Sequence, residues 1–348
     1  MPTPQALSLF SEATRSWFAQ SFSEPTPAQE GTWSSVARGQ DTLVVAPTGS
    51  GKTLAAFLWA LDRIANSALP PATERLRVLY VSPLKALAVD VERNLNSPVN
   101  GIARAAERLG LPVPRITFGL RTGDTPQEQR RRFPANPPDI LITTPESLFL
   151  LLTSQAREAL RWVDTVIVDE VHAVAGTKRG AHLAVSLERL DALLARPAQR
   201  IGLSATVRPL PEVAKFLGGT REVTIVNPPS EKRFDLSVVV PVEDMGEMGE
   251  ELNEISEGSA VRDPDHKTIW PSIENRLVEL IQAHRSTIVF VNSRRLSERV
   301  CAQINELAGE QIARAHHGSV SKEQRKLIEE DLKLGLLKAV VATSSLEL

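Results

Sequence analysis

The sequence lacks the features of secreted, membrane-spanning and disordered proteins. Cys301 is the single cysteine among 348 residues, so the chain can form no internal disulfide and no cysteine-rich zinc site. No apolar run approaches the ~18 residues that span a bilayer, and the first ten residues show no basic segment followed by an apolar one, as a signal peptide would. With 42% hydrophobic and 24% charged residues, the composition is that of a globular protein. We therefore expect a cytoplasmic, monomeric protein with no membrane span and no metal cluster.

The chain also lacks a large excess of either charge, because its formal net charge is −2. This balance hides one acidic segment, residues 241–265, in which nine acidic residues and one arginine give a net charge of −8. The rest of the chain therefore carries +6. That value is compatible with a polyanionic partner and does not prove one.

Short apolar runs alternate with helical patterns along the first 226 residues. The expected strands are residues 42–46, 77–82, 140–143, 165–168 and 200–203, and the expected helices include residues 54–64 and 178–194. Runs of Val, Ile and Leu between helices are typical of a parallel sheet covered on both faces. Ligands of such sheets bind beyond the carboxyl ends of the strands, so the polar residues directly after each strand are the candidates for function.

The α/β pattern begins again after a break at residues 227–229, Asn-Pro-Pro. Residues 234–241 are expected to be extended, and the acidic segment that follows is expected to be a mobile insertion. Helical patterns at 270–283, 297–308 and 322–334 then accompany expected strands at 286–291 and 338–342. We predict two tandem α/β domains with parallel sheets, residues 1–226 and 286–348, joined by a linker at 227–285. The second domain is short enough that we expect it to be truncated.

A glycine-rich segment lies between the first expected strand and the helix after it, and reads Ala46-Pro47-Thr48-Gly49-Ser50-Gly51-Lys52-Thr53. The glycines let the backbone curl so that its N–H groups face a phosphate at the helix N-terminus. In such a loop, Lys52 reaches the β- and γ-phosphates and the Thr53 hydroxyl holds Mg²⁺. Residues 47–53 are therefore predicted to bind ATP, although Ala46 replaces the usual first glycine. A turn that only caps the helix is the alternative.

Two carboxylates, Asp169 and Glu170, directly follow the expected strand at 165–168. Asp169 is predicted to hold the same Mg²⁺, and Glu170 to orient and deprotonate the attacking water. Acidic pairs also occur at helix N-termini without any catalytic role. The phosphate loop upstream favours catalysis, with Lys52, Asp169 and Glu170 as the catalytic residues.

Gln29 and a Ser-Ala-Thr segment are candidates for recognising and reporting the nucleotide. The Gln29 amide offers a donor and an acceptor side by side, which matches the N6/N7 edge of adenine, and Phe18 or Phe22 could pack near the base. An exposed glutamine at a helix start is the alternative. Ser204 and Thr206 follow the expected strand at 200–203. Their hydroxyls could form hydrogen bonds with the acidic pair and transmit the presence of the γ-phosphate to a neighbouring domain. A cap at a helix start is the alternative.

The order of these motifs gives the chain a resemblance to the superfamily-two helicases of the DEAD/DEAH-box type. The chain is more closely similar to the Lhr (large helicase-related) family. The resemblance covers nearly the whole chain. It rests also on residues 82–90, 143–148, 169–172 and 204–206, and in the second half on residues 289–295, 316–319 and 342–347.

The resemblance implies tandem RecA-like domains that bind ATP and Mg²⁺ and track along a nucleic-acid strand. The implied partner is single-stranded DNA or the tail of an RNA or DNA duplex, with 3′-to-5′ movement and a role in DNA repair. The strand contacts that it implies come from Pro83, Leu84, Lys85, Thr144, Glu146, Arg294 and Thr343. Hydroxyl and backbone N–H groups there suit phosphate contacts that are blind to sequence.

A histidine and an arginine run could each have more than one role. His172, with Ser204 and Thr206, is expected to couple the nucleotide site to the domain interface rather than bind a metal. The run Arg130-Arg131-Arg132 is expected to be a solvated helix face.

The sequence departs from the family at its end. Family members continue beyond the position of Leu348 with a motif whose arginines reach the γ-phosphate, so we expect this chain alone to bind ATP with little turnover. One alternative is a DEAD-box-like RNA helicase, which Val171 and His172 disfavour because those proteins have Ala and Asp there. The other is an ATP-responsive nucleic-acid-binding protein that does not hydrolyse ATP.

Overall fold

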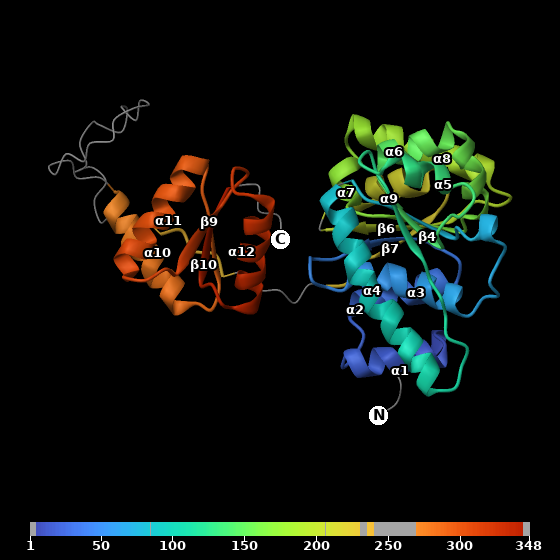
Figure 1. Cartoon of the computed structure of the whole chain (residues 1–348), viewed down its shortest axis with the longest axis horizontal. Helices are drawn as coiled ribbons and strands as arrows, with labels where there is room; N and C mark the ends of the chain where they lie inside the picture. The colour runs from blue at the N-terminus through green and yellow to red at the C-terminus, as the bar shows by residue number, and fades with distance from the viewer. Residues whose placement is uncertain (1–4, 84, 206, 230–234, 240–268, 344–348) are drawn as a thin grey trace. The chain divides into compact units, whose positions relative to one another are not determined.

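The computed structural model describes residues 5–83, 85–205, 207–229, 235–239 and 269–343 (Figure 1). The chain divides into two compact units, residues 1–232 and 233–348. Within the described residues, the first unit holds a seven-stranded sheet of order β3-β4-β2-β5-β6-β1-β7, and the second a three-stranded sheet of order β8-β10-β9. All neighbouring strands pair in parallel. The prediction of an α/β fold with two parallel sheets is confirmed.

Five strands of the first sheet lie within one residue of the predicted bounds, and β3 and β7 were not predicted. The strands are β1 (Asp41–Val45), β2 (Val78–Val81), β3 (Phe118–Arg121), β4 (Ile140–Thr143), β5 (Thr165–Val168), β6 (Gln199–Ser204) and β7 (Val223–Val226). The five predicted strands are buried almost throughout, whereas β3 and β7 are only partly buried. The two that were missed form the edges of the sheet.

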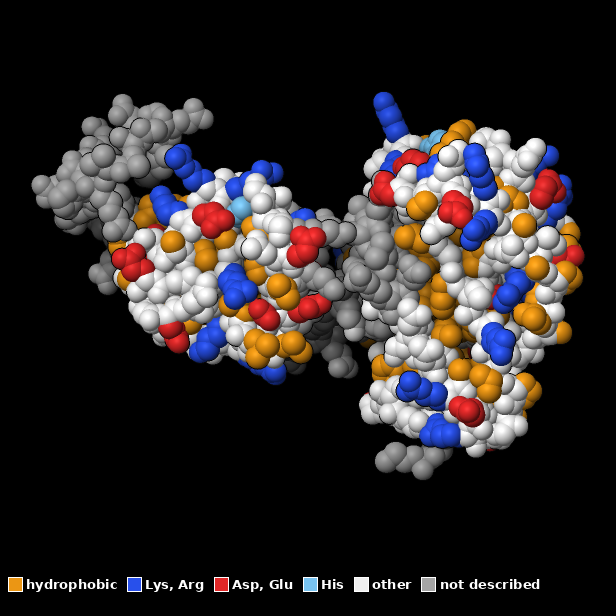
Figure 2. All heavy atoms as spheres, viewed as in Figure 1, with side chains coloured by type: hydrophobic (Ala, Val, Ile, Leu, Met, Phe, Trp, Pro, Cys, Tyr) orange, Lys and Arg blue, Asp and Glu red, His pale blue; other side chains and the backbone are white. Residues whose placement is uncertain are grey.

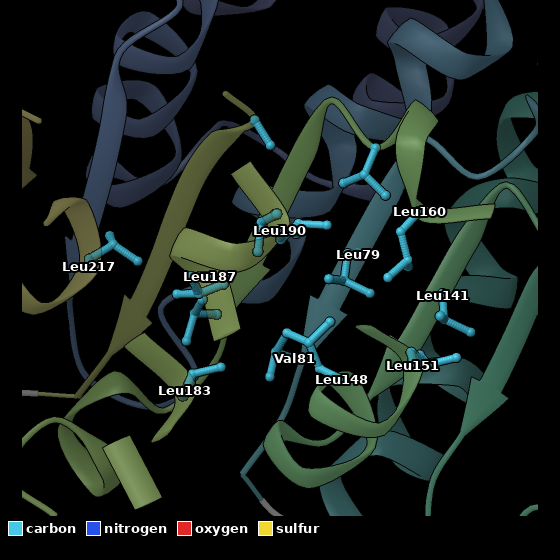
Figure 3. Packing of buried hydrophobic residues seen from close by; sticks show 14 of the residues in the cluster. Leu79, Val81, Leu141, Leu148, Leu151, Leu160, Leu183, Leu187, Leu190 and Leu217 are labelled. Carbon is cyan, nitrogen blue, oxygen red and sulfur yellow. The ribbon is translucent and has the colours of Figure 1, made fainter. Parts of the chain in front are cut away.

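Helices cover both faces of the first sheet (Figure 1). The helices of this unit are α1 (Glu12–Ser21), α2 (Pro27–Ala37), α3 (Lys52–Ala65), α4 (Lys85–Arg108), α5 (Gln127–Arg132), α6 (Pro145–Leu152), α7 (Val171–Val174), α8 (Lys178–Leu193) and α9 (Leu210–Gly218). Side chains alternate along each strand, so neighbouring residues of β2 face opposite layers. Leu79 and Val81 pack with residues of α6, α8 and α9, as Figure 3 shows in part, and Val78 and Tyr80 pack with α2, α3 and α4.

An aromatic cluster fixes the N-terminal helices to this unit. Phe10, Trp17, Phe18 and Trp33 are buried together, with Trp33 edge-on to Phe10 and to Phe18. The indole N–H of Trp33 donates to the Ala55 carbonyl in α3 at 3.0 Å. This bond holds α2 against α3, and so sets the position of Gln29 relative to the start of α3.

In the second unit, helices also lie on both faces of the sheet. Its elements are α10 (Trp270–Ala283), β8 (Thr287–Phe290), α11 (Arg294–Ala308), β9 (Ala313–His316), α12 (Lys322–Leu334) and β10 (Ala339–Ala342). Ile281, Val300 and Ile304, from α10 and α11, pack with Val341 on one face, and Ile328 and Leu332 of α12 pack with Val340 on the other.

The structure tests the predicted elements of the second half in part. The helices α10 and α12 have their predicted bounds, α11 begins three residues earlier than predicted, and the bounds of β8 and β10 lie within one residue of the prediction. The strand β9 was not predicted. The predicted extended segment is described only at residues 235–239, where no strand forms, and the acidic segment 241–265 lies outside the described residues.

On the face of the first unit seen in Figure 2, acidic and basic side chains are interspersed. None of the helices that the structure describes is long and apolar enough to cross a bilayer. Nor do the described His, Cys, Asp and Glu side chains form a group of three or more that could hold a metal ion.

Candidate active site

The predicted phosphate loop connects β1 to α3. Gly49 and Gly51 have φ angles of 80° and 79°, in the left-handed region that favours glycine. At Gly51 there is a second constraint, because a Cβ atom would lie 2.6 Å from the side-chain nitrogen of Gln29. The loop therefore requires glycine at position 51 both for its backbone conformation and for the approach of Gln29.

Gln29 lies against the phosphate loop and is only 3% exposed. Its Oε1 accepts a hydrogen bond from the Thr26 N–H at 3.0 Å, as part of a capping box at the start of α2. The Thr26 hydroxyl donates to the Ser50 carbonyl at 2.9 Å, which ties the start of α2 to the loop. The alternative of an exposed Gln29 is therefore wrong, while its contact with adenine stays a prediction.

The two aromatic candidates for packing near a base have different surroundings. Phe18 is buried in the aromatic cluster, and Phe22 is 42% exposed. Of the two, Phe22 is therefore the side chain that could contact a base.

Two polar groups of the loop indicate a site for an anion. Lys52 Nζ donates to the carbonyls of Ala46 and Pro47, the latter at 3.0 Å, so the ammonium lies across the loop. Among the described residues, the buried hydroxyl of Ser50 finds no hydrogen-bond partner. Since an unpaired buried hydroxyl costs about 1–3 kcal/mol, a bound phosphate that accepts this bond would recover that energy. The residues of the loop therefore fit a phosphate group, such as that of a nucleotide.

Asp169 is buried at the carboxyl end of β5, between β2 and β6. Its carboxylate accepts hydrogen bonds from the Tyr80 hydroxyl on β2 and from the Glu170 N–H, the latter at 2.9 Å. Burial raises the pKa of Asp169, and burial together with the Asp169 charge raises the pKa of Tyr80 well above its usual range. A desolvated carboxylate of this kind is stabilised by a cation, so Asp169 fits the predicted Mg²⁺ site, and the contact of Thr53 with this ion stays a prediction. Tyr80 gave no signal in the sequence.

Glu170 has a strained backbone. Its φ of 45° is the only positive value among the non-glycine residues that the structure describes, and this conformation costs about 1–2 kcal/mol. His172 Nδ1 lies 3.2 Å from Glu170 Oε2 and 3.3 Å from Ser204 Oγ. The structure thus brings together Glu170, His172 and Ser204, three of the predicted catalytic and coupling residues. Thr206 lies outside the described residues.

Pro83, Thr144 and Glu146 lie at the carboxyl edge of the first sheet, after the neighbouring strands β2 and β4. The buried Thr144 hydroxyl caps α6 by accepting from the Ser147 N–H at 3.4 Å. Glu146 is bound by Arg179, whose Nε and Nη2 donate to its two carboxylate oxygens. Arg179 lowers the pKa of Glu146 to about 2. Leu84 and the side chain of Lys85 lie outside the described part of the chain.

Two arginines at this edge, Arg130 and Arg179, donate to backbone carbonyls. Arg179 was not singled out from the sequence, although its Nη1 also donates to the Pro83 carbonyl at 2.5 Å. Arg130 is partly exposed, and its guanidinium donates to the carbonyls of Thr125 at 2.7 Å and Gly123 at 2.6 Å. These bonds close the turn that follows β3. Arg131 and Arg132 are exposed, as predicted.

In the second unit, Arg294 and Thr343 lie beyond the carboxyl ends of β8 and β10. Arg294 begins α11, and its guanidinium donates to the Ser319 hydroxyl at 2.9 Å. The Thr343 N–H donates to the His316 carbonyl at 3.2 Å. Their predicted contacts with a strand stay predictions.

A parallel sheet with a phosphate loop after β1 and an Asp-Glu pair after β5 defines the RecA-like class of P-loop nucleotide-binding proteins. Residues 26–214 match the family model described as DEAD/DEAH box helicase, and residues 272–348 match the helicase conserved C-terminal domain. The first match alone covers more than half of the chain. The chain therefore belongs to the DEAD/DEAH box helicase family.

Within this family the predicted resemblance to the Lhr helicases is confirmed. The chain is 58% identical to the Lhr helicase/probable uracil glycosylase of Mycolicibacterium smegmatis, over 98% of this chain and 24% of that protein. It is 51% identical to the Lhr helicase/uracil glycosylase of Escherichia coli, over 100% of this chain and 25% of that protein. The chain thus spans about a quarter of the length of these relatives.

A solved structure agrees with these relatives. The Mycobacterium smegmatis helicase Lhr, bound to ssDNA and AMP-PNP, superimposes with a TM-score of 0.79 at 61% sequence identity. The match covers 99% of this chain and 43% of that one.

Proposed function

We propose that this chain binds ATP and couples ATP hydrolysis to movement along single-stranded DNA, as the motor part of an Lhr-type helicase. One observation carries the proposal, namely that the phosphate loop and the Asp169-Glu170 pair lie at the same edge of the sheet. The loop follows β1 and the acidic pair follows β5, and both strands pair with β6. The loop also contains the Ser50 hydroxyl, which has no partner among the described residues. Ligands of parallel sheets bind at these carboxyl ends.

In the proposed site, the backbone of residues 47–51 surrounds the phosphates and Lys52 moves from the loop carbonyls to the β- and γ-phosphates. Thr53 and Asp169 hold Mg²⁺, which when bound offsets the negative charge of the phosphates. Gln29 lies against the same loop and selects adenine. Glu170 accepts the proton of the attacking water, so ADP and inorganic phosphate are the products.

The proposed partner is DNA because the structurally similar Mycobacterium smegmatis Lhr is bound to ssDNA. Pro83, Leu84, Lys85, Thr144, Glu146, Arg294 and Thr343 stay our candidates for strand contacts, and His172, Ser204 and Thr206 for the coupling. The 3′-to-5′ direction and a role in DNA repair rest on the family resemblance alone.

The test is ATP hydrolysis by the chain with no strand, with single-stranded DNA, and with RNA of the same sequence. Glu170→Gln serves as the blank, and Glu212→Gln, an exposed pair partner of Lys215, as the matched control. A small turnover that exceeds the blank and rises with DNA is the expected result. Stronger stimulation by RNA would favour the DEAD-box-like alternative, and no detectable ATP binding would overturn the proposal.

One further outcome would identify the second candidate. ATP binding and nucleotide-dependent DNA binding, both without phosphate release, would indicate an ATP-responsive strand-binding protein.

A further inference from the structure

Arg179 joins two segments of the first unit that are distant in sequence. From the first turn of α8, its guanidinium holds the Glu146 carboxylate at the start of α6 with two hydrogen bonds, and the Pro83 carbonyl after β2 with a third. A planar guanidinium can make these bonds together because its donors have a fixed fork geometry. The segments after β2 and β4 are therefore held in one arrangement by a single side chain.

The position of Arg179 is in turn fixed relative to the acidic pair. Glu170 precedes α7, and α7 leads to α8 through residues 175–177. The Thr177 hydroxyl donates to the Val174 carbonyl at 2.8 Å and accepts from the Gly180 N–H at 3.1 Å. At Gly180, an added Cβ would lie 2.0 Å from the Val174 carbonyl oxygen. The end of α7 and the start of α8 thus pack without space between them, so Arg179 must follow any shift of α7.

The charge of Arg179 also affects how a nucleic-acid strand can bind at this edge of the sheet. An unpaired Glu146 carboxylate would repel phosphates, whereas the pair with Arg179 is neutral. Because the pKa of Glu146 lies at about 2, the Glu146 carboxylate and the Arg179 guanidinium are both ionised at neutral pH, and their charges cancel. Arg179 therefore has two separable effects, neutralisation of Glu146 and placement of the Pro83 segment.

We propose that Arg179 is a positioning residue that couples the nucleotide site to the strand-binding segments of the first unit. A shift of α7, caused by nucleotide at Glu170 and His172, moves Arg179 and with it the segments after β2 and β4. Coupling of two sites requires an element that both sites bias, and the unit formed by α7, the start of α8 and Arg179 has contacts to both. This inference rests on the proposed function, and Arg179 itself need not touch nucleotide or strand.

The experiment measures the affinity of the chain for a fluorescent single-stranded DNA, with and without AMP-PNP and Mg²⁺. For the wild-type chain we expect the nucleotide to change this affinity by at least ~5-fold, the lower range of measured couplings. In Arg179→Ala we expect the ratio of the two affinities to fall close to one, while the affinity for AMP-PNP without DNA stays within about 2-fold. Arg179→Lys should retain part of the coupling, since lysine keeps the charge without the fork.

Lys178→Ala is the matched control, because Lys178 is the exposed neighbour of Arg179 on α8. We expect it to keep the wild-type ratio. The double variant Arg179→Ala/Glu146→Gln separates the two effects of the guanidinium. If it restores the coupling, Arg179 acts only by neutralising Glu146 and the positioning role is overturned. If it stays uncoupled, the positioning role is supported.

Other outcomes are equally decisive. An unchanged ratio in Arg179→Ala overturns the inference and leaves the proposed function intact. Loss of AMP-PNP affinity in Arg179→Ala assigns it a structural role in the nucleotide site and also overturns the inference. A wild-type chain that binds neither AMP-PNP nor DNA would instead overturn the proposed function.

Discussion

Among the described residues, the two sheets differ in how many of their strands have a hydrogen-bonded neighbour on each side: five in the first sheet and one, β10, in the second. The strands β2, β4 and β5 in the first sheet are buried at every residue. In the second sheet, β10 is likewise buried at every residue, whereas the edge strand β8 alternates between partly buried and exposed residues, and its Ile288 and Phe290 are 36% and 62% exposed. Burial of apolar area contributes most of the free energy of folding, so we infer that the first unit is the more stable of the two.

The two ends of the first sheet also differ, in how their polar groups are paired. At the amino end, the buried Arg200 guanidinium donates to the Leu217 carbonyl, Glu188 and Asp191. At the carboxyl end, the Ser50 hydroxyl finds no partner among the described residues, and Glu170 has a left-handed backbone. At the amino end the Arg200 charge is satisfied internally, and at the carboxyl end Ser50 and Glu170 supply an unpaired and a strained group of the kind that is typical of ligand sites.

The largest expected effect tests the comparison of the two sheets. Leu79→Ala empties a fully buried position on β2, whereas Ile288→Ala truncates a half-exposed position on β8. We expect the first to cost about 3 kcal/mol of unfolding free energy and the second about 1 kcal/mol or less, since the cost follows the cavity left behind. Hydrogen exchange of peptides from β2 and β8, followed by mass spectrometry, measures each unit separately. Equal losses at the two positions would contradict the inferred difference.

The next effect tests whether nucleotide binding belongs to the first unit alone. Lys52→Ala removes the cation of the phosphate loop, and charge-assisted hydrogen bonds contribute about 1.5–3 kcal/mol. We therefore expect AMP-PNP to bind roughly 10- to 100-fold more weakly, as measured by calorimetry. Lys215→Ala, an exposed lysine on α9, and Arg294→Ala in the second unit should leave this affinity unchanged. An equal loss in Arg294→Ala would show that the second unit contributes to the site.

The strands that could be predicted from the sequence are mainly those that are buried on both faces of the sheet. A strand that is buried on both faces needs a continuous run of Val, Ile and Leu, and the five predicted strands of the first unit have such runs or nearly so. Phe118–Arg121 reads Phe-Gly-Leu-Arg and Ala313–His316 reads Ala-Arg-Ala-His. Both are edge strands that are only partly buried and have no run of Val, Ile and Leu, so their composition does not distinguish them from loops.

The candidate site was predictable where its residues are contiguous in the sequence. The phosphate loop and the acidic pair are local patterns whose chemistry depends on neighbouring residues. Tyr80 and Arg179 act across 89 and 96 positions, on Asp169 and Pro83 respectively. Such pairs depend on which strands become neighbours in the sheet, and no local pattern carries that information.

A smaller effect concerns the pH dependence of the pair between Glu146 and Arg179. The pKa of Glu146 is lowered from an ordinary 4.5 to about 2, so the stabilisation is present above pH 4.5 and is lost as the pH falls toward 2. A difference of this size corresponds to ~3 kcal/mol, but the Glu146 side chain is 55% exposed and solvent screening reduces it to ~1 kcal/mol.

The measurement for this pair compares the wild-type chain with Glu146→Gln in urea unfolding between pH 6 and pH 3.5. We expect the wild-type advantage to shrink as the pH is lowered. Glu158→Gln is the control for an exposed pair, formed with Arg161. A constant difference across this range would show that the charge of Glu146 does not stabilise the fold.

The smallest expected effect concerns the exposed side of β8. Phe290→Thr keeps a strand-forming residue and changes the unfolding free energy by less than ~0.5 kcal/mol, because the side chain is mostly in solvent. The same change should lower the fluorescence of the apolar dye ANS, since Phe290 and Ile288 lie on one side of the strand. Leu69→Thr, at an exposed position of the first unit outside its helices and strands, should leave the fluorescence unchanged, because a single exposed leucine forms no patch. If both substitutions lower the ANS fluorescence equally, the exposed side of β8 binds the dye no better than a single exposed leucine of the first unit. The inferred difference in stability between the two units would then depend only on their buried cores.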